Sequence, residues 1–317
     1  MAARLHPATA PGRSGSAGGS GSGCAVCAAG PSVADPAEQR APADEPPVLL
    51  AVAHGSRSAE GVATGRALLG RVRELRPELD VRCCFLDLAR PSLPEALDAL
   101  RGRPAVLVPL LLGAGYHLRV DLPGALAAAG LAHLPLAPAL GPHPLLAAAL
   151  ADRLTDSGRP AGAGPVVLAA AGSSDPAANA DTAQMARMLA DRLADGRPVV
   201  PAYLSAAHPT PQQAVTALHA AGHRHVAVAT YLLAPGFFAT RAAATPARWT
   251  GAPLGTHDGL ARLVAERYDR ARAGQALSDR ALADRSGNDR ARPDRAHAAR
   301  VHPARIHADR STMAGAG

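Results

Sequence analysis

PVLLAVAHGSR, residues 47–57, is a continuous apolar run that ends in a histidine, a glycine and a serine. Runs of this length, followed by glycine and polar residues, are typical of a buried strand in a parallel sheet. A second stretch, PVVLAAAGSSD at residues 165–175, matches the first without a gap. Two copies of one strand and turn predict that the chain repeats a single structural unit.

The sequence on either side repeats in the same order. FLDLARPS (85–92) matches YLSAAHPT (203–210), VLVPLLLGAGYH (106–117) matches AVATYLLAPGFF (227–238), and LGPH ending at His143 matches LGTH ending at His257. Between the apolar runs, residues 61–75 place apolar side chains three to four apart, as on one helix face. The alternation predicts an α/β fold of two tandem domains, each a parallel sheet flanked by helices.

Composition sets the expected domain bounds. We expect residues 47–157 and 163–270 to form the two domains, joined by a Pro/Gly/Ala segment. Residues 1–46 are rich in Gly, Ser, Ala and Pro and predict a disordered leader. Residues 271–317 repeat Asp, Arg and His at steps of five, which predicts a low-complexity charged tail, with a metal-collecting arm as the alternative.

The charged residues exclude several kinds of chemistry. All 33 basic residues are arginine, and both ATP-binding P-loops and Schiff-base catalysis need a lysine. The net charge of +7 comes without a recognition helix, so we expect no nucleic acid, whereas an anionic small molecule fits. Prolines interrupt the uncharged stretch 122–151, which predicts helix, buried strand and turn instead of a membrane span.

Four cysteines give no disulfide framework. Cys83 and Cys84 are adjacent on a predicted strand, where neighbouring side chains point to opposite faces. The start of the chain has no apolar segment of the length that a signal peptide needs. We therefore expect a cytoplasmic protein. The role of the pair Cys24 and Cys27 is left open.

Two histidines follow predicted strands. His54 follows the first strand and His117 the third, and ligands of open parallel sheets bind at the carboxyl ends of strands. The first and third strands can be neighbours, so both side chains would reach one cleft. Two imidazoles suit Fe²⁺, Co²⁺ or Ni²⁺, and a structural zinc site needs four ligands. The pattern predicts an open site that takes up and releases a metal, with structural histidines as the alternative.

The motifs AHGSR, FLDLARPSLPEAL, VPLLLGAGYHLRVDLP and LGPHPLL, in this order, resemble the sirohydrochlorin chelatase family (CbiX/SirB-like) in its long tandem form. The resemblance spans about residues 48–268 and implies two chelatase-like domains. It implies metal insertion into sirohydrochlorin, an anionic tetrapyrrole, which gives sirohaem with iron or a cobalamin precursor with cobalt; we expect Fe²⁺ and sirohaem. It assigns metal binding and catalysis to His54 and His117. We expect no tightly bound cofactor, since the divalent metal is a substrate, and no use of ATP, since the chain has no lysine.

The second copy departs from this pattern, with Gly172 opposite His54 and Phe238 opposite His117. We expect it to line the cleft through Ser173 and Ser174 at a helix start and through the flat rings of Phe237 and Phe238. Further substrate-binding candidates flank the histidines in the first copy: Ser56, Arg57, Gly115, Tyr116 and Arg119.

Arg57 and Arg119 are the candidates for the substrate's carboxylates, because a guanidinium pairs with a carboxylate in bidentate geometry. A solvated surface arginine is the alternative for each. Arg90 stands where the family often has an acidic residue, which leaves Asp87 as the acidic candidate.

Several alternatives stay open at this point. The enzyme could be a cobaltochelatase of cobalamin biosynthesis, since imidazole accepts both iron and cobalt. A non-enzymatic metallochaperone or tetrapyrrole-binding protein would use the same cleft. A serine hydrolase is disfavoured, because Ser56 lacks a G-x-S-x-G context. The oligomeric state, monomer or homo-oligomer, is left open.

Overall fold

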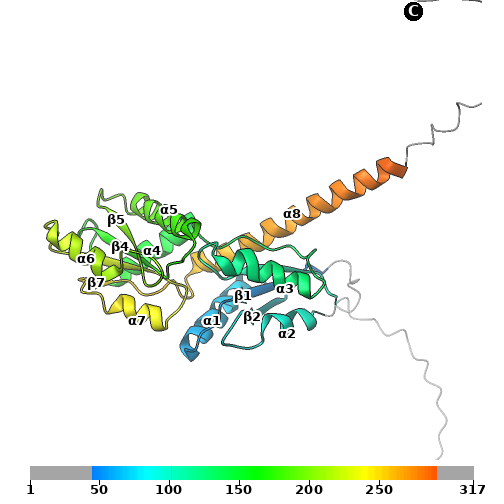
Figure 1. Cartoon of the computed structure of the whole chain (residues 1–317), viewed down its shortest axis with the longest axis horizontal. Coiled ribbons are helices and arrows are strands. Elements are labelled where there is room, and N and C mark those ends of the chain that lie inside the picture. The colour runs from blue at the N-terminus through cyan, green and yellow to red at the C-terminus, as the bar shows by residue number, and fades with distance from the viewer. Residues whose placement is uncertain (1–44, 101, 291–317) are drawn as a thin grey trace, which may run out of the picture. The chain divides into compact units, whose positions relative to one another are not determined.

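The structure is a computed structural model that describes residues 45–100 and 102–290, with side chains through residue 280. The described residues from Pro46 onward form one compact unit, which contains two halves of similar architecture (Figure 1). The predictions for residues 1–44 and for the tail beyond residue 290 lie outside the described residues.

The first half begins with β1 and ends with α4. Its elements are β1 (Val48–Ala53), α1 (Ala59–Leu75), β2 (Val81–Phe85), α2 (Leu93–Asp98), β3 (Ala105–Pro109), the π-helix η1 (His117–Asp121), α3 (Leu122–Ala128) and α4 (Pro144–Asp156). Local chemistry explains several of these bounds. Ser58 caps α1 by accepting from the Gly61 N–H, and α2 starts with a capping box formed by Ser92 and Glu95.

The second half repeats this order. Its elements are β4 (Val166–Ala170), α5 (Pro176–Leu193), β5 (Val199–Tyr203), α6 (Pro211–Ala220), β6 (Ala227–Tyr231), α7 (Phe237–Ala243), β7 (Trp249–Thr250) and α8 (Asp258–Arg290). The capping box recurs at Thr210 and Gln213. Leu88 and Ala206, at matching positions of the turns after β2 and β5, both have a positive φ, of 61° and 56°. The two halves therefore share their turns as well as their strands.

Each half has its own parallel sheet. The strand order is β2-β1-β3 in the first half and β5-β4-β6-β7 in the second. The α/β fold of two parallel sheets flanked by helices is thus confirmed, and β1 is the direct neighbour of β3, as the cleft prediction requires. One expectation was wrong in part: the buried strand predicted within residues 122–151 is reduced to a single bridge between Leu107 and Leu136, and α4 follows it.

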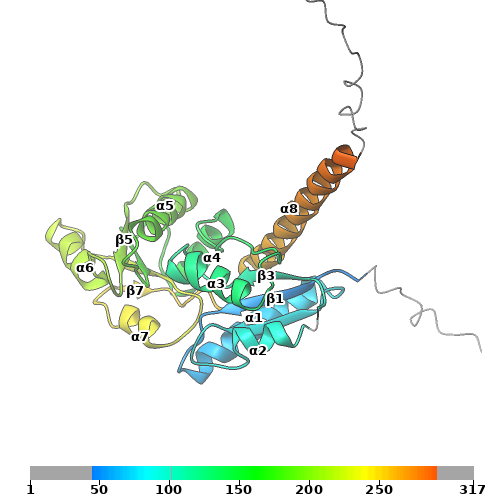
Figure 2. The same ribbon diagram turned by 45° about the vertical axis from the view of Figure 1, so that its right-hand side comes forward.

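The last helix of each half packs on the other half. Helix α8 contacts α1 and β3 of the first half, and α4 contacts α5 and β6 of the second. Figures 1 and 2 show α8 in orange, running from the second half past the strands of the first. The helix passes residue 270, where the predicted tail begins, and continues to Arg290. No helix in the described part of the chain combines the length and apolarity that crossing a membrane takes.

The core follows from the period-two alternation of the strands. In β1, Leu49 and Ala51 face a core that both halves share, whereas Leu50 and Val52 face a separate core under α2 and α3. Cys83 packs toward the shared core and Cys84 toward the separate one, so their predicted opposite orientation is confirmed. Burial raises the pKa of the Cys84 thiol to about 12, which makes this cysteine a packing residue.

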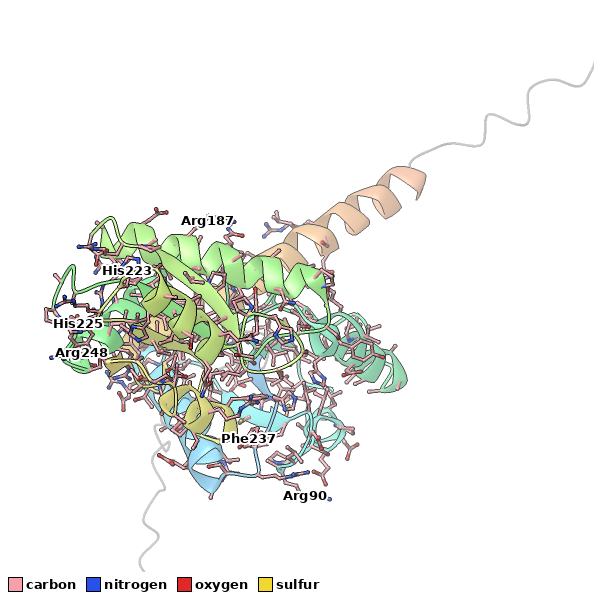
Figure 3. The ribbon with its side chains drawn as sticks, turned by 60° about the vertical axis from the view of Figure 1, so that its left-hand side comes forward. Arg90, Arg187, His223, His225, Phe237 and Arg248 are labelled. Atoms are coloured by element: carbon pink, nitrogen blue, oxygen red, sulfur yellow. The ribbon has the colours of Figure 1, made fainter. Side chains whose placement is uncertain are left out.

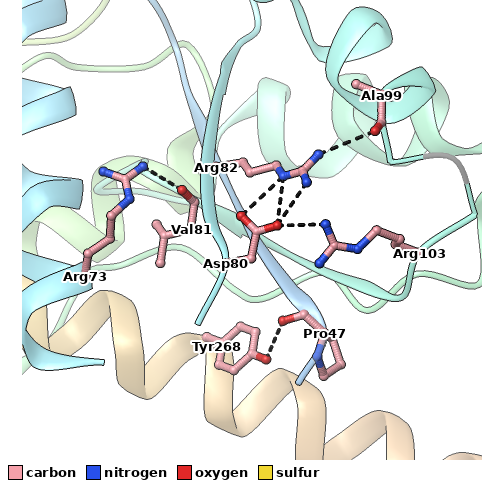
Figure 4. A network of polar contacts seen from close by, with 8 residues as sticks. All are labelled: Pro47, Arg73, Asp80, Val81, Arg82, Ala99, Arg103 and Tyr268. Atoms are coloured by element: carbon pink, nitrogen blue, oxygen red, sulfur yellow. Dashed lines mark hydrogen bonds and ion pairs between the residues drawn. The ribbon is translucent and has the colours of Figure 1, made fainter. Parts of the chain in front are cut away.

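A polar network closes the amino ends of the first sheet (Figure 4). Asp80, just before β2, accepts from Arg82 at 2.9 Å and from Arg103 at 2.8 Å. Burial alone raises the pKa of Asp80, but the hydrogen bonds from these arginines lower it overall. The Tyr268 hydroxyl on α8 donates to the Pro47 carbonyl at 2.7 Å. This last hydrogen bond joins α8 to the start of β1, at the end of the sheet opposite His54.

The turns after β1 and β4 need glycine in both halves. Gly55 and Gly172 have φ of +97° and +87°, and an added Cβ would lie 1.7 Å from the Asp87 carbonyl oxygen and 2.0 Å from that of Ser205. The left-handed conformation alone costs an L-residue roughly 1–2 kcal/mol. We expect Gly55→Ala and Gly172→Ala each to lower the urea midpoint of unfolding.

The matched control is Gly70→Ala on α1, where nothing lies within 4 Å of the added Cβ. Alanine is favoured over glycine inside a helix by about 1 kcal/mol, so this variant is expected to unfold at or above the wild-type midpoint. A wild-type midpoint for Gly55→Ala would show that the turn accommodates a Cβ, which contradicts the close contact with the Asp87 carbonyl oxygen.

Candidate active site

His54 is the first residue after β1 and is exposed. Its carbonyl accepts from the Asp87 N–H at 3.0 Å, which ties the end of β1 to the turn after β2. Gly55 then turns the chain against this same loop. The backbone around His54 is therefore held against the turn after β2, while its side chain is exposed.

His117 meets His54 from the neighbouring strand. A glycine-containing loop leads from β3 to η1, of which His117 is the first residue. The two imidazole rings lie edge to face, with centroids 4.7 Å apart and planes at 88°. The predicted convergence of these two histidines on one site is thus what the structure shows.

A second contact of His117, with Asp121, was not among the predicted site residues. Asp121 Oδ2 lies 2.6 Å from His117 Nδ1, within the same π-helix. The signal was present as the spacing of four residues in HLRVD, which brings the two side chains to one helix face. Short π-helical segments are rare and often occur at functional sites.

The polar candidates of the first half divide into caps and exposed groups. Ser56 Oγ accepts from the Ser58 N–H at 3.0 Å and so supports the cap of α1. Arg57 and Tyr116 are exposed, Tyr116 at 65%. Arg119 forms an ion pair with Asp175 of the second half at 3.4 Å. Asp175 was not among the predicted site residues.

The candidates of the second half differ in their contacts and exposure. The N-cap of α5 is Asp175 instead of Ser173 or Ser174. Ser173 Oγ accepts from the Asp175 N–H at 3.1 Å. Phe237 is 73% exposed, whereas Phe238 packs against the core under α6 and α7. Phe237 is thus the more accessible of the two rings, and the role of Phe238 as a second flat face stays a prediction.

The loops of the two halves contact each other around the site. The Tyr231 hydroxyl donates to the Leu112 carbonyl at 2.9 Å, and burial raises the pKa of this phenol, which keeps it a donor. Ser173 Oγ would lie 3.8 Å from a Cβ at Gly115. A Cβ at Gly236, before α7, would likewise lie 3.8 Å from Ser56 Oγ. The carboxyl ends of both sheets thus face one another.

A shallow pocket of about 280 Å³ lies in the turn after β2, lined by residues 85–90 and Ser92. Asp87 lies in this turn, beside the end of β1, and its Oδ1 accepts from the Leu88 N–H. Arg90 pairs with Glu95 at the outer side of the same turn. Within the described residues, no group of three or more His, Cys, Asp and Glu side chains could hold a metal ion.

Other histidines have structural roles or lie elsewhere. His143 Nδ1 accepts from the Leu145 N–H as the N-cap of α4, and His257 Nδ1 accepts from the Gly259 N–H. Figure 3 shows His223, His225 and Arg248 at one end of the second half, apart from Phe237. His225 precedes β6 and stacks edge-on against Trp249 at the start of β7, so it lies at the amino ends of the strands.

The geometry defines a tandem α/β protein in which two histidines of one half converge at the carboxyl ends of the parallel strands, facing a half that lacks both. The sequence model of the CbiX family matches residues 48–157 and again residues 165–271, more than half of the chain. The chain belongs to the CbiX family. The resemblance drawn from the sequence is thereby confirmed.

Two curated relatives come from Priestia megaterium. The chain is 28% identical over 239 residues to a sirohydrochlorin ferrochelatase, and the matched region covers 69% of this chain and 88% of that protein. It is 26% identical over 205 residues to a sirohydrochlorin cobaltochelatase, which covers 61% of this chain and 66% of that protein. The two relatives are named for different metals.

Solved structures share the fold. SirB from Bacillus subtilis with Fe³⁺ has a TM-score of 0.61 and 22% identity, covering 71% of this chain and 94% of that one. CbiX, described as the terminal enzyme for biosynthesis of siroheme in denitrifying bacteria, has a TM-score of 0.52 and 22% identity, covering 71% and 99%.

Proposed function

We propose that this protein inserts Fe²⁺ into sirohydrochlorin to give sirohaem, with the metal as a substrate. The observation that carries the proposal is the edge-to-face pair of His54 and His117 at the carboxyl ends of neighbouring strands. Membership of the CbiX family and the similarity to a sirohydrochlorin ferrochelatase support it.

The imidazoles are suited to a metal that must be released. Two nitrogen ligands leave most coordination positions of a first-row ion open, so the pyrrole nitrogens of the substrate can enter as the histidines leave. Two pyrrole N–H protons must depart as the metal enters the ring. Imidazole carries either a metal or a proton near neutral pH, so each histidine that gives up the ion can accept one of these protons.

Arginines and an exposed ring hold the tetrapyrrole in this proposal. Arg119 is paired with Asp175 at 3.4 Å in the structure, and a carboxylate of the substrate would take over that partner role. Arg57, next to the Ser56 turn, is the second carboxylate ligand. Phe237, exposed and with the Arg241 guanidinium 5.7 Å from its ring, offers an apolar face to the macrocycle.

The second half acts as a wall of the site. It has Gly172 and Phe238 where the first half has its two histidines, so it supplies no imidazole at those positions. Ser173, close to Gly115, and Tyr116 complete the proposed lining.

We propose that residues 47–157 and 163–270 are the two chelatase-like domains, and that they work in the cytoplasm without ATP or a resident cofactor.

Cobalt is the second candidate metal, because one curated relative is a sirohydrochlorin cobaltochelatase. Imidazole binds both ions, and affinity order alone does not set the metal used in a cell. Anaerobic insertion rates with Fe²⁺ and Co²⁺, at equal metal concentration and with the same protein, rank the two. A higher kcat/KM with cobalt would replace ferrochelatase by cobaltochelatase and leave the site unchanged.

One experiment separates an enzyme from a metallochaperone or tetrapyrrole-binding protein. Purified protein is mixed with sirohydrochlorin and Fe²⁺ in large excess over protein, without ATP, and the absorbance change is followed. An enzyme gives many turnovers and a rate proportional to its concentration. A carrier gives at most one equivalent of product for each protein, which would overturn the proposal.

A further inference from the structure

The side chain of Asp121 is directed at His117. Its Oδ2 lies 2.6 Å from Nδ1, and both side chains are partly exposed, at 39% and 45%. Asp121 is the last residue of η1, which runs directly into α3, and its backbone is helical, with φ of −67° and ψ of −44°. Its carboxylate makes no capping hydrogen bond to α3, and its contact is with His117.

We propose that Asp121 is a positioning residue that accepts the Nδ1–H of His117 and leaves Nε2 as the nitrogen that binds the metal. The inference rests on the proposed function, because it takes His117 as the metal-handling imidazole. A carboxylate behind a ligating histidine fixes the tautomer and the ring orientation and makes the other nitrogen more basic.

The repeat within the chain provides an internal comparison. The alignment that places His117 on Phe238 places Asp121 on Ala242, four residues further along each copy. Ala242 is fully buried in α7, so the second half forms its helix at this place without a carboxylate. The copy that lacks the imidazole also lacks its partner, while it keeps the shared turns and the capping box.

This pattern distinguishes positioning from a purely structural role. A residue needed for the local fold would be retained by both halves, as the N-capping histidines before α4 and near the start of α8 are. Asp121 is retained only beside a histidine. Alanine at residue 121 reproduces what the second half already has, so we expect Asp121→Ala to fold and to melt within a few degrees of wild type.

The test compares Asp121→Ala and Asp121→Asn in the full chain, with Asp98→Asn, an exposed aspartate at the end of α2, as the control. Co²⁺ affinity is measured by calorimetry without tetrapyrrole. We expect Asp121→Ala to weaken binding by about 10–100-fold, as for other partners of metal-ligating histidines. Asparagine keeps an acceptor oxygen but loses the charge, so its affinity is expected to lie between wild type and alanine.

A second readout reports on the tautomer itself. Nitrogen-15 spectra of labelled protein at mildly alkaline pH, with His117→Ala used to assign the signal, are expected to show the Nδ1–H form of His117. Asp121→Ala is expected to shift it toward the Nε2–H form. Wild-type Co²⁺ affinity together with a wild-type tautomer in Asp121→Ala would overturn the inference. Wild-type protein that binds Co²⁺ but never turns over sirohydrochlorin would instead refute the proposed function alone.

Discussion

His54→Ala and His117→Ala are each expected to slow metal insertion by about 10²–10⁴-fold, the range that a positioned proton-transfer group contributes. The two rings are in contact, with centroids 4.7 Å apart, so each variant removes one of the two proposed metal ligands. Because the residues act on the same ion, the double variant should be little slower than either single one. Initial rates of insertion, with near-wild-type tetrapyrrole binding, provide the measurement.

His143→Ala and His257→Ala are the matched controls. Each removes an imidazole that caps a helix, which costs about 1 kcal/mol of stability, but neither ring belongs to the His54 site. Both controls are expected to insert metal at the wild-type rate at 25 °C. A larger loss of rate in His257→Ala than in His54→Ala would mean that the active site lies elsewhere.

A chain that ends at His257 is expected not to fold. It lacks α8, whose Leu260, Leu263 and Val264 are wholly buried in the core shared by both halves. Burying one such side chain contributes about 1.5–3 kcal/mol, so the three together contribute about 5–9 kcal/mol. This is comparable with the whole stability of a typical domain, about 5–15 kcal/mol. Circular dichroism and urea unfolding measure the outcome.

A chain that ends at Ala273 is the control for this truncation. It keeps the buried residues of α8 up to Tyr268, and residues 269–280 are mostly exposed. We expect wild-type stability and wild-type turnover. A cooperative melt of the chain ending at His257 would contradict the conclusion that α8 is needed to complete the core shared by both halves. Loss of turnover in the chain ending at Ala273 would show that residues beyond it take part in the activity.

The repeat and the strand order could be predicted because they depend on local pattern. Buried strands read as uninterrupted apolar runs, and helices show a spacing of three to four residues. The packing of α4 and α8 on the opposite halves could not be predicted. An apolar stripe shows that one face of a helix is buried, but it does not show which sheet covers that face. The strand expected before α4 failed for a related reason, since a short apolar run near prolines pairs only at Leu136.

The site was predicted as far as sheet geometry reaches. Neighbouring parallel strands bring the residues after them together, so His54 and His117 could be paired from the sequence. Asp121 was missed because the notable feature of its motif was the histidine, and Asp175 because its partner Arg119 belongs to the other half. The difference in exposure between Phe237 and Phe238 could not be predicted, because sequence positions alone do not show which of two adjacent rings packs against the core.

The most direct test of the two-histidine metal site is the X-ray absorption spectrum of one equivalent of Co²⁺ bound to the full chain. The chain has 13 histidines, so the spectrum is compared between wild type and the His54→Ala/His117→Ala double variant. We predict imidazole scattering from two rings in wild type and its loss in the double variant. An unchanged imidazole signal in the double variant would place the metal on other histidines and contradict the account.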